Sequence, residues 1–113
     1  VNSIGAYAFS GCESITAIEI PNSVKVINQY AFYNSTGLTS VTLGSAITSV
    51  GNYTFYSCTK LQKLYCKATT PPLLGTTAIP TTIGIIYVPR ASVDEYKALW
   101  SDYANKIVGY DFE

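Results

Sequence analysis

The side chains that could do acid–base or nucleophilic chemistry are few in this chain of 113 residues. Histidine is absent, which removes the commonest general base near neutral pH and the usual partner of a serine or cysteine nucleophile. The cysteines, Cys12, Cys58 and Cys66, are 46 and 8 residues apart, spacings that match neither a CxxC pair nor a framework of paired disulfides. A catalytic triad is therefore excluded, and we expect no metal site.

The carboxylates are also poorly placed for catalysis. A glycosidase needs two carboxylates that face each other across roughly 5 to 9.5 Å. Glu13 precedes a predicted strand and Glu19 lies on it, whereas Asp94 and Glu95 are assigned to a helix N-terminus, where their charge favours the helix dipole. None of the eight glycines has the spacing of a phosphate-binding loop. No constellation supports an enzyme, and we expect no cofactor.

The overall charge narrows the choice of partners. The formal net charge is zero, and only 12% of the residues are charged, so the chain lacks the basic surface that nucleic acid or an anionic membrane attracts. The longest apolar run covers residues 85–88, far short of the ~20 residues that a membrane helix needs. We expect no binding to nucleic acid and no membrane insertion.

The elements that position these side chains come from a repeat of 23 residues. Three units of equal length follow one another without a gap, at residues 4–26, 27–49 and 50–72. Similar residues recur in six columns: Ile4, Ile27 and Val50; Tyr7, Tyr30 and Tyr53; Phe9, Phe32 and Phe55; Ile15, Leu38 and Leu61; Ile18, Val41 and Leu64; Ile20, Leu43 and Cys66.

Each unit ends in an L-x-x-L-x-L run, such as the one that places Leu38, Val41 and Leu43. Its last residues alternate with the period of a half-buried strand. One short strand per repeat predicts an α/β solenoid with a single parallel sheet, whose strands lie ~4.8 Å apart and are joined by irregular or short helical crossovers. Cys12 and Cys58, two rungs apart, are then too distant for a disulfide, so all three thiols should be free.

The pattern I-G-x-x-A-F-x-x-C-x-x-L-x-x-L-x-I-P, present almost entire in residues 4–21, resembles the BspA-like leucine-rich repeat of bacterial surface proteins. The resemblance covers residues 1–72 and, less regularly, residues 73–113. Asn28, Ser35, Gly44 and Thr54 depart from the pattern, and these changes are conservative for packing. The resemblance implies a leucine-rich repeat fold and a location outside the cell or on its surface.

The residues after the repeats are interpreted as an irregular fourth rung and a helical C-terminal cap, which makes residues 1–113 a single domain. Residues 86–89 predict a fourth strand. Ser92 and Glu95 have the spacing of a capping box, which predicts a helix from residue 93 to about residue 106. One apolar stripe should seal the last rung: Val93, Tyr96, Leu99, Trp100, Tyr103 and Ile107.

Outward-facing strand residues form two columns across the predicted sheet. The first contains Ala17, Ser40, Lys63 and Ile85, and the second contains Glu19, Thr42, Tyr65 and Tyr87. In leucine-rich repeat proteins this face binds partners, so the resemblance implies a binding role for Tyr65, Tyr87, Ile85, Lys63, Glu19 and Thr42. The alternative interpretation is an aromatic ladder that only steadies the sheet.

A second aromatic column lies on the crossovers and contains Tyr7, Tyr30 and Tyr53, with Tyr33 and Tyr56 beside them. Rings one rung apart can stack. The column is either packing or a platform for a protein or a glycan, because tyrosine presents a flat apolar ring with a polar tip.

Two functions are consistent with these features. The first is a non-catalytic surface or secreted adhesion module, the C-terminal fragment of a longer protein, whose partner is a host extracellular matrix protein or another cell-surface protein. The second is a structural spacer or cap of a longer array with no binding site of its own. The chain opens at Val1, inside a repeat, so we expect the fragment to self-associate through its N-terminal edge.

Overall fold

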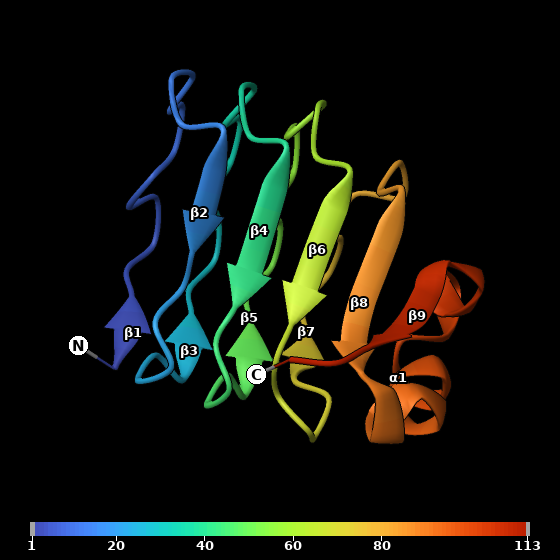
Figure 1. Cartoon of the computed structure of the whole chain (residues 1–113). Helices are drawn as coiled ribbons and strands as arrows, with labels where there is room; N and C mark the ends of the chain where they lie inside the picture. Colours follow the sequence, from blue (N-terminus) through green and yellow to red (C-terminus); the bar gives the residue numbers. More distant parts are fainter. Residues whose placement is uncertain (1, 113) are drawn as a thin grey trace.

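The computed structural model describes residues 2–112 as a coil built on two parallel sheets (Figure 1). One sheet has the order β1-β3-β5-β7 and contains β1 (Ser3–Ile4), β3 (Val26–Ile27), β5 (Ser49–Val50) and β7 (Leu73–Leu74). The other has the order β2-β4-β6-β8-β9 and contains β2 (Ala17–Glu19), β4 (Ser40–Leu43), β6 (Lys63–Cys66), β8 (Ile85–Pro89) and β9 (Ile107–Tyr110). Each turn of the chain, called a rung below, adds one strand to each sheet as far as β8.

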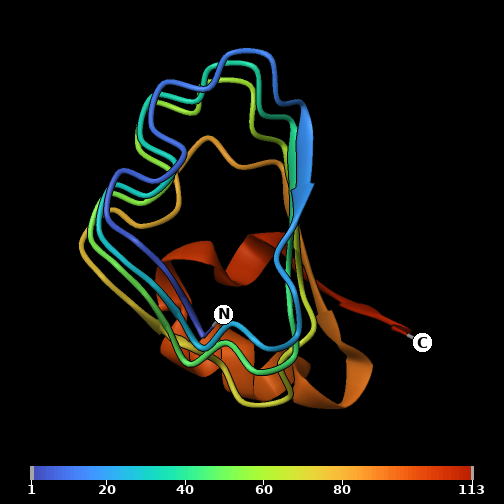
Figure 2. The ribbon, with the colours of Figure 1, turned by 90° about the vertical axis from the view of Figure 1, so that its left-hand side faces the viewer.

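The predicted register of the long strands is confirmed. Ala17 pairs with Ser40, which pairs with Lys63, which pairs with Ile85. The prediction of a single sheet was wrong, because a second parallel sheet runs along the opposite side of the coil (Figure 2). Its strands have two residues each, too few for an alternating pattern to be visible in the sequence.

The crossovers between the two sheets are irregular turns without a helix in the described residues. Their backbone repeats closely: Tyr7, Tyr30 and Tyr53 all have a left-handed conformation, with φ of 62°, 59° and 56°. Tyrosine rarely adopts this conformation. Two residues after each tyrosine a phenylalanine points inward, and Phe9, Phe32 and Phe55 stack with ring centroids 5.1 and 5.2 Å apart.

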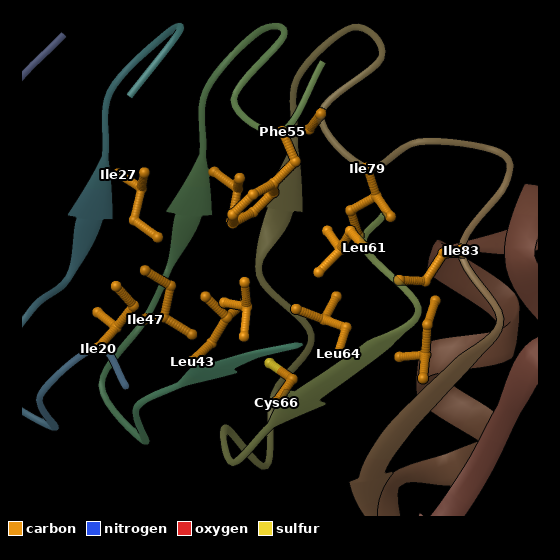
Figure 3. Packing of buried hydrophobic residues seen from close by; sticks show 14 of the residues in the cluster. Ile20, Ile27, Leu43, Ile47, Phe55, Leu61, Leu64, Cys66, Ile79 and Ile83 are labelled. Carbon is orange, nitrogen blue, oxygen red and sulfur yellow. The ribbon is translucent and has the colours of Figure 1, made fainter. Parts of the chain in front are cut away.

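The core lies between the two sheets and is continuous along the coil (Figure 3). The position of the repeat occupied by Cys12, Ser35 and Cys58, called the cysteine column, makes polar as well as apolar contacts. The thiol of Cys58 donates to the carbonyl of Phe32 at 3.1 Å, and in the rung before, the hydroxyl of Ser35 donates to the carbonyl of Phe9 at 2.7 Å. Cysteine and serine are therefore interchangeable here because each is a small donor directed at the preceding rung.

The N-terminal end of the coil leaves its apolar residues only partly covered. Ile4, Phe9, Ile15 and Ile18 are half-buried, whereas their equivalents one rung later are fully buried: Ile27, Phe32, Leu38 and Val41. A hollow of about 420 Å³ opens at this end, beside Ile4, Phe9 and Ile18. The strands β1 and β2 are edge strands of their sheets. Their unpaired backbone edges therefore lie beside the same apolar surface.

The C-terminal residues form a 3₁₀ turn (Arg90–Ser92), helix α1 (Val93–Leu99), a second 3₁₀ segment (Ser101–Lys106) and β9. The predicted capping box is wrong, because the hydroxyl of Ser92 makes no cap and instead donates to the carbonyl of Thr69 at 2.7 Å. The predicted helix is also too long. It ends at Leu99, which is 51% exposed rather than part of the apolar stripe, and Ile107 begins a strand.

Three aromatic side chains connect this C-terminal segment to the end of the coil by hydrogen bonds. The hydroxyl of Tyr96 donates to the carbonyl of Ala68, the indole of Trp100 to that of Pro72, and the hydroxyl of Tyr103 to that of Ile79. All three rings are buried. They cover the last rungs with apolar surface and at the same time supply donors to backbone carbonyls that have no further rung to bond.

Candidate binding surfaces

The outer sheet face, formed by the outward residues of β2, β4, β6 and β8, has the two predicted columns. Inward residues such as Val41, Leu64 and Ile86 are fully buried, and the residues between them point out. Lys63 and Ile85 pair in one column, and Thr42 pairs with Glu19 and with Tyr65 in the other. The predicted site residues therefore share one surface.

Tyr65 and Tyr87 are the closest aromatic pair on this face, with stacked rings 4.6 Å apart and only 12° from parallel. Two further rings pack on them. Tyr110 meets both rings edge-on, at centroid distances of 5.5 and 5.1 Å, and Phe112 lies 4.9 Å from Tyr110 and 6.4 Å from Tyr65. These four residues, called the aromatic patch, leave Tyr65 and Tyr87 half-buried.

Tyr110 and Phe112 were not predicted as members of this surface. The signal that could have found them is the alternation of Val108, Tyr110 and Phe112, which has the period of a strand. It was obscured because Ile107 continues the helical spacing of the preceding aromatic residues. β9 joins β8 in parallel, with Val108 opposite Tyr87, and the chain after β9 then runs across the outer sheet face (Figures 1 and 2).

An ion pair holds the end of this segment. The guanidinium of Arg90 donates to both carboxylate oxygens of Asp111, at 2.9 and 3.4 Å. These hydrogen bonds and the positive charge lower the pKa of Asp111. Both side chains are largely exposed, so the pair positions the segment and contributes little to stability.

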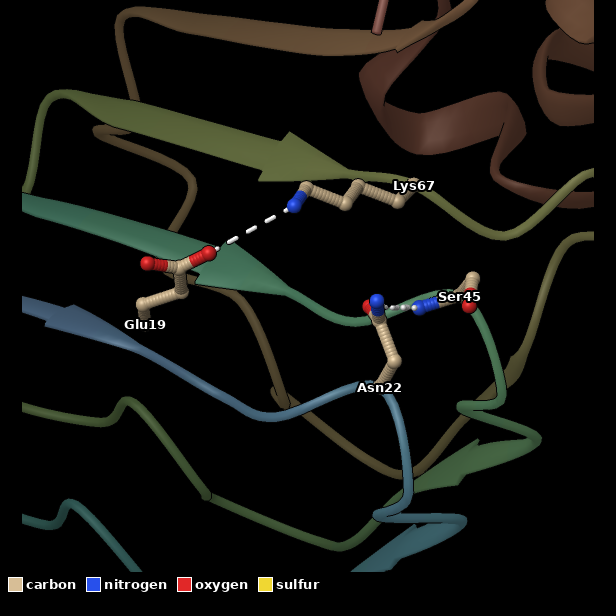
Figure 4. Close-up of polar contacts among 4 residues, drawn as sticks. All are labelled: Glu19, Asn22, Ser45 and Lys67. Atoms are coloured by element: carbon tan, nitrogen blue, oxygen red, sulfur yellow. Dashed lines mark hydrogen bonds and ion pairs between the residues drawn. The ribbon is translucent and has the colours of Figure 1, made fainter. Parts of the chain in front are cut away.

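The N-terminal half of the outer sheet face is polar. Glu19 pairs with Lys67 at 3.4 Å, and Asn22 accepts a hydrogen bond from the amide of Ser45 at 3.0 Å (Figure 4). Thr42 lies between Glu19 and Tyr65 in the register. The face therefore has an aromatic end toward the C-terminus and a charged, polar end toward the N-terminus.

The second surface is the tyrosine cluster on the crossovers. Tyr7, Tyr30 and Tyr53 stack at 5.1 and 5.4 Å, and Tyr33 and Tyr56 stack beside them at 5.9 Å. The two stacks meet edge-on, through Tyr30 with Tyr33 and Tyr53 with Tyr56. Partial burial and the neighbouring phenols raise the pKa of Tyr30. Tyr7 and Tyr56 are the most exposed members, at 55% and 44%.

The thiols are free, as predicted: Cys58 and Cys66 are buried and Cys12 is half-buried. Burial raises the pKa of Cys58 and of Cys66 to about 11. A thiolate is the reactive form of cysteine, so neither buried thiol is activated as a nucleophile. Within residues 2–112, no three histidine, cysteine, aspartate or glutamate side chains lie close enough to hold a metal ion.

Comparison with known proteins agrees with the repeat. Residues 1–73 match the family model described as "BspA type Leucine rich repeat region (6 copies)". No curated protein matches the chain. Among the described residues, no helix has the length and apolar character needed to cross a membrane.

Proposed function

Because the chain belongs to the BspA-type leucine-rich repeat family, we propose that it is a non-catalytic, cell-surface or secreted module whose outer sheet face binds a protein partner. The family consists of repeat proteins that are generally non-catalytic and often surface-associated. Leucine-rich repeat domains commonly mediate protein–protein interactions. The partner that we propose is an extracellular matrix protein of a host or another cell-surface protein.

The observation that carries this proposal is the aromatic patch. Its four rings gather at the C-terminal end of the face, whereas Glu19, Ser40 and Thr42 lie toward the N-terminal end, and Tyr110 is 41% exposed. Aromatic residues are enriched at the centre of protein interfaces and charged ones at the rim. Lys63 and the Arg90–Asp111 pair correspond to such a rim, because they lie beside the rings and are exposed to solvent.

The test is a Tyr65→Ser, Tyr87→Ser double variant in a binding assay with immobilised matrix proteins. Truncation of interface hot spots costs about 2 kcal/mol or more, which corresponds to a loss of affinity of about thirtyfold. A Tyr7→Ser variant is the matched control, because it removes an exposed tyrosine from the opposite side of the core. Circular dichroism checks that each variant is folded.

Undiminished binding by the double variant would remove the function from the outer sheet face. That result would favour the second candidate, a structural spacer or cap. One observation supports this candidate: Tyr110 and Phe112 already cover part of Tyr65 and Tyr87, as they would if the rings only packed the sheet against the C-terminal segment.

We also infer that residues 1–113 are one domain, in which the C-terminal segment acts as the cap of a solenoid. The support is a single hydrophobic cluster that extends from Ile20 to Ile107, together with the hydrogen bonds of Tyr96, Trp100 and Tyr103 to the end of the coil. Limited proteolysis should accordingly leave residues 4–107 as one resistant fragment.

A further inference from the structure

The fourth rung is shorter than the third on the side of the tyrosine cluster. β5 pairs with β7 at an offset of 24 residues, with Val50 opposite Leu74. β6 pairs with β8 at an offset of 22, with Lys63 opposite Ile85. Two residues of the third rung therefore have no equivalent in the fourth, and the fourth rung takes a shorter path inside the other three (Figure 2).

The backbone hydrogen bonds identify these two residues. The amide of Phe55 donates to the carbonyl of Ala78, which still follows the first offset. The turn in which the amide of Leu61 donates to the carbonyl of Cys58 is repeated in the fourth rung by Ile83 and Pro80, which follow the second offset. The unmatched residues lie between Phe55 and Cys58, and they are Tyr56 and Ser57.

A surface groove of about 260 Å³ lies at this place, lined by Tyr56, Ser57, Thr59, Thr77, Pro80 and Thr82 among others. One face of the Tyr56 ring stacks on Tyr33, 6° from parallel. The opposite face is directed toward the fourth rung, where no residue corresponds to Tyr56. The aromatic stack therefore ends at Tyr56, on the side where this groove lies.

The chemistry of the groove selects its occupant. Its lining residues carry no charge, and the ammonium of Lys106, which lies beside one of them, is engaged by the carbonyl of Thr81. This lining disfavours an anionic or cationic ligand. Within the described part of the chain, no hydrogen bond engages the hydroxyls of Thr59, Thr77 or Thr82, so these groups are available to a ligand. An exposed aromatic face next to unengaged hydroxyls suits a ring that is apolar on its flat side and carries hydroxyls at its edge.

We propose that this groove binds a neutral pyranose residue of a glycan, stacked on the free face of Tyr56. The site is separate from the outer sheet face and does not depend on the function proposed above. A proline or aromatic side chain of a protein would share the stacking but would not use the hydroxyls.

The proposal can be tested by NMR titration of the full chain with methyl glycosides of glucose, galactose, mannose and N-acetylglucosamine. At least one should produce saturable amide shifts confined to residues 56–59 and 77–82. Tyr56→Ala should weaken that binding about tenfold, because the stacking surface is lost, and Thr82→Val should weaken it about threefold. Tyr56→Phe keeps the ring and should retain binding.

Two controls separate the groove from the other surfaces. Tyr7→Ala removes the exposed tyrosine at the far end of the cluster and should leave the affinity unchanged. The Tyr65→Ser, Tyr87→Ser variant should also bind the glycoside normally, even if it loses its protein partner.

Three results would overturn the proposal. The first is the absence of a saturable shift with all four glycosides, and the second is equal binding by Tyr56→Ala and the natural chain. The third is a groove that responds only to a proline-rich peptide, which would make it a peptide site. If Tyr56→Ala does not fold, the comparison of Thr82→Val with Tyr56→Phe decides between the same outcomes.

Discussion

The indole nitrogen of Trp100 donates a 2.9 Å hydrogen bond to the carbonyl of Pro72, although the two residues are 28 positions apart in the chain. Trp100 is 2% exposed and meets Tyr96 edge-on at 4.9 Å. One side chain thus buries apolar surface and satisfies a backbone acceptor at the end of the coil.

Replacement of Trp100 should therefore destabilise the protein through two effects that can be measured separately, the loss of packing and the loss of the hydrogen bond. Trp100→Ala should lower the free energy of unfolding by about 3 to 5 kcal/mol, the usual cost of deleting a buried tryptophan. Trp100→Phe retains much of the packing and should cost about 1 to 3 kcal/mol for the carbonyl left without its donor. Urea unfolding measures both, with Leu99→Ala as the control, because Leu99 is adjacent but exposed. A neutral Trp100→Ala would mean that the C-terminal segment does not stabilise the coil.

The hydrogen bond of Cys58 predicts that serine and alanine at this position affect stability differently. Cys58→Ser should change the free energy of unfolding by less than about 1 kcal/mol, since a hydroxyl can replace the thiol as the donor to Phe32. Cys58→Ala should cost about 2 kcal/mol, because it removes a buried atom as well as the donor. Ser35 shows that a hydroxyl is accommodated in this column. Equal destabilisation by both variants in chemical unfolding would show that volume alone determines this position.

The raised thiol pKa values predict the order of chemical modification. At pH 8, iodoacetamide should alkylate half-buried Cys12 first, while Cys58 and Cys66 stay protonated and covered. Mass spectrometry of the intact chain over time shows the order. Alkylation of Cys58 as fast as Cys12 would contradict the burial described here.

The same thiols should make stability depend on alkaline pH. The pKa of Cys58 rises from an ordinary value of 9.0 to about 11 on folding, so the folded state holds its proton more tightly than the unfolded state. The stabilisation is complete below pH 9 and is lost as the pH rises toward 11. The loss in unfolding free energy between pH 8 and pH 10.5 should be smaller in Cys58→Ser than in the natural chain.

The N-terminal end should mediate self-association. Its half-buried residues and the two open strand edges form one surface, and such edges pair readily. Light scattering should show a mass that increases with concentration. Ile18→Lys, with a charge on the apolar end, should prevent the increase, whereas Ala17→Lys, with the charge on the outer sheet face, should not. A strictly monomeric state of the unsubstituted chain of residues 1–113 at high concentration would refute this prediction.

The repeat could be predicted because its information is local and recurs. Val41 and Leu43 alternate with the outward Ser40 and Thr42, and the same offset reproduces the pattern in each unit, so the register of the outer sheet face followed directly. The second sheet could not be predicted in this way. Val26 and Ile27 form a complete strand of that sheet, and their pairing depends on neighbours 23 residues away rather than on any pattern within the dipeptide.

The candidate sites could also be predicted only in part. Stacking of Tyr65 on Tyr87 followed from the register, but the covering of both by Tyr110 and Phe112 depends on a strand that begins where helical spacing still continues. Ser92 has the spacing of a helix cap but donates its hydroxyl to the carbonyl of Thr69 instead. This carbonyl of the neighbouring rung competes with the helix end for the hydroxyl. Tertiary neighbours decided both cases.

In the chain of residues 1–113 the two ends of the coil are chemically unlike, and this difference determines how two copies of that chain can associate. One end presents incompletely covered apolar side chains, and the other is closed by Tyr96, Trp100 and Tyr103. A contact that needs two apolar ends can form only between like ends of two copies. Between two copies of residues 1–113 such a contact is isologous and uses both surfaces when it forms, so it closes at two subunits and cannot propagate into a filament.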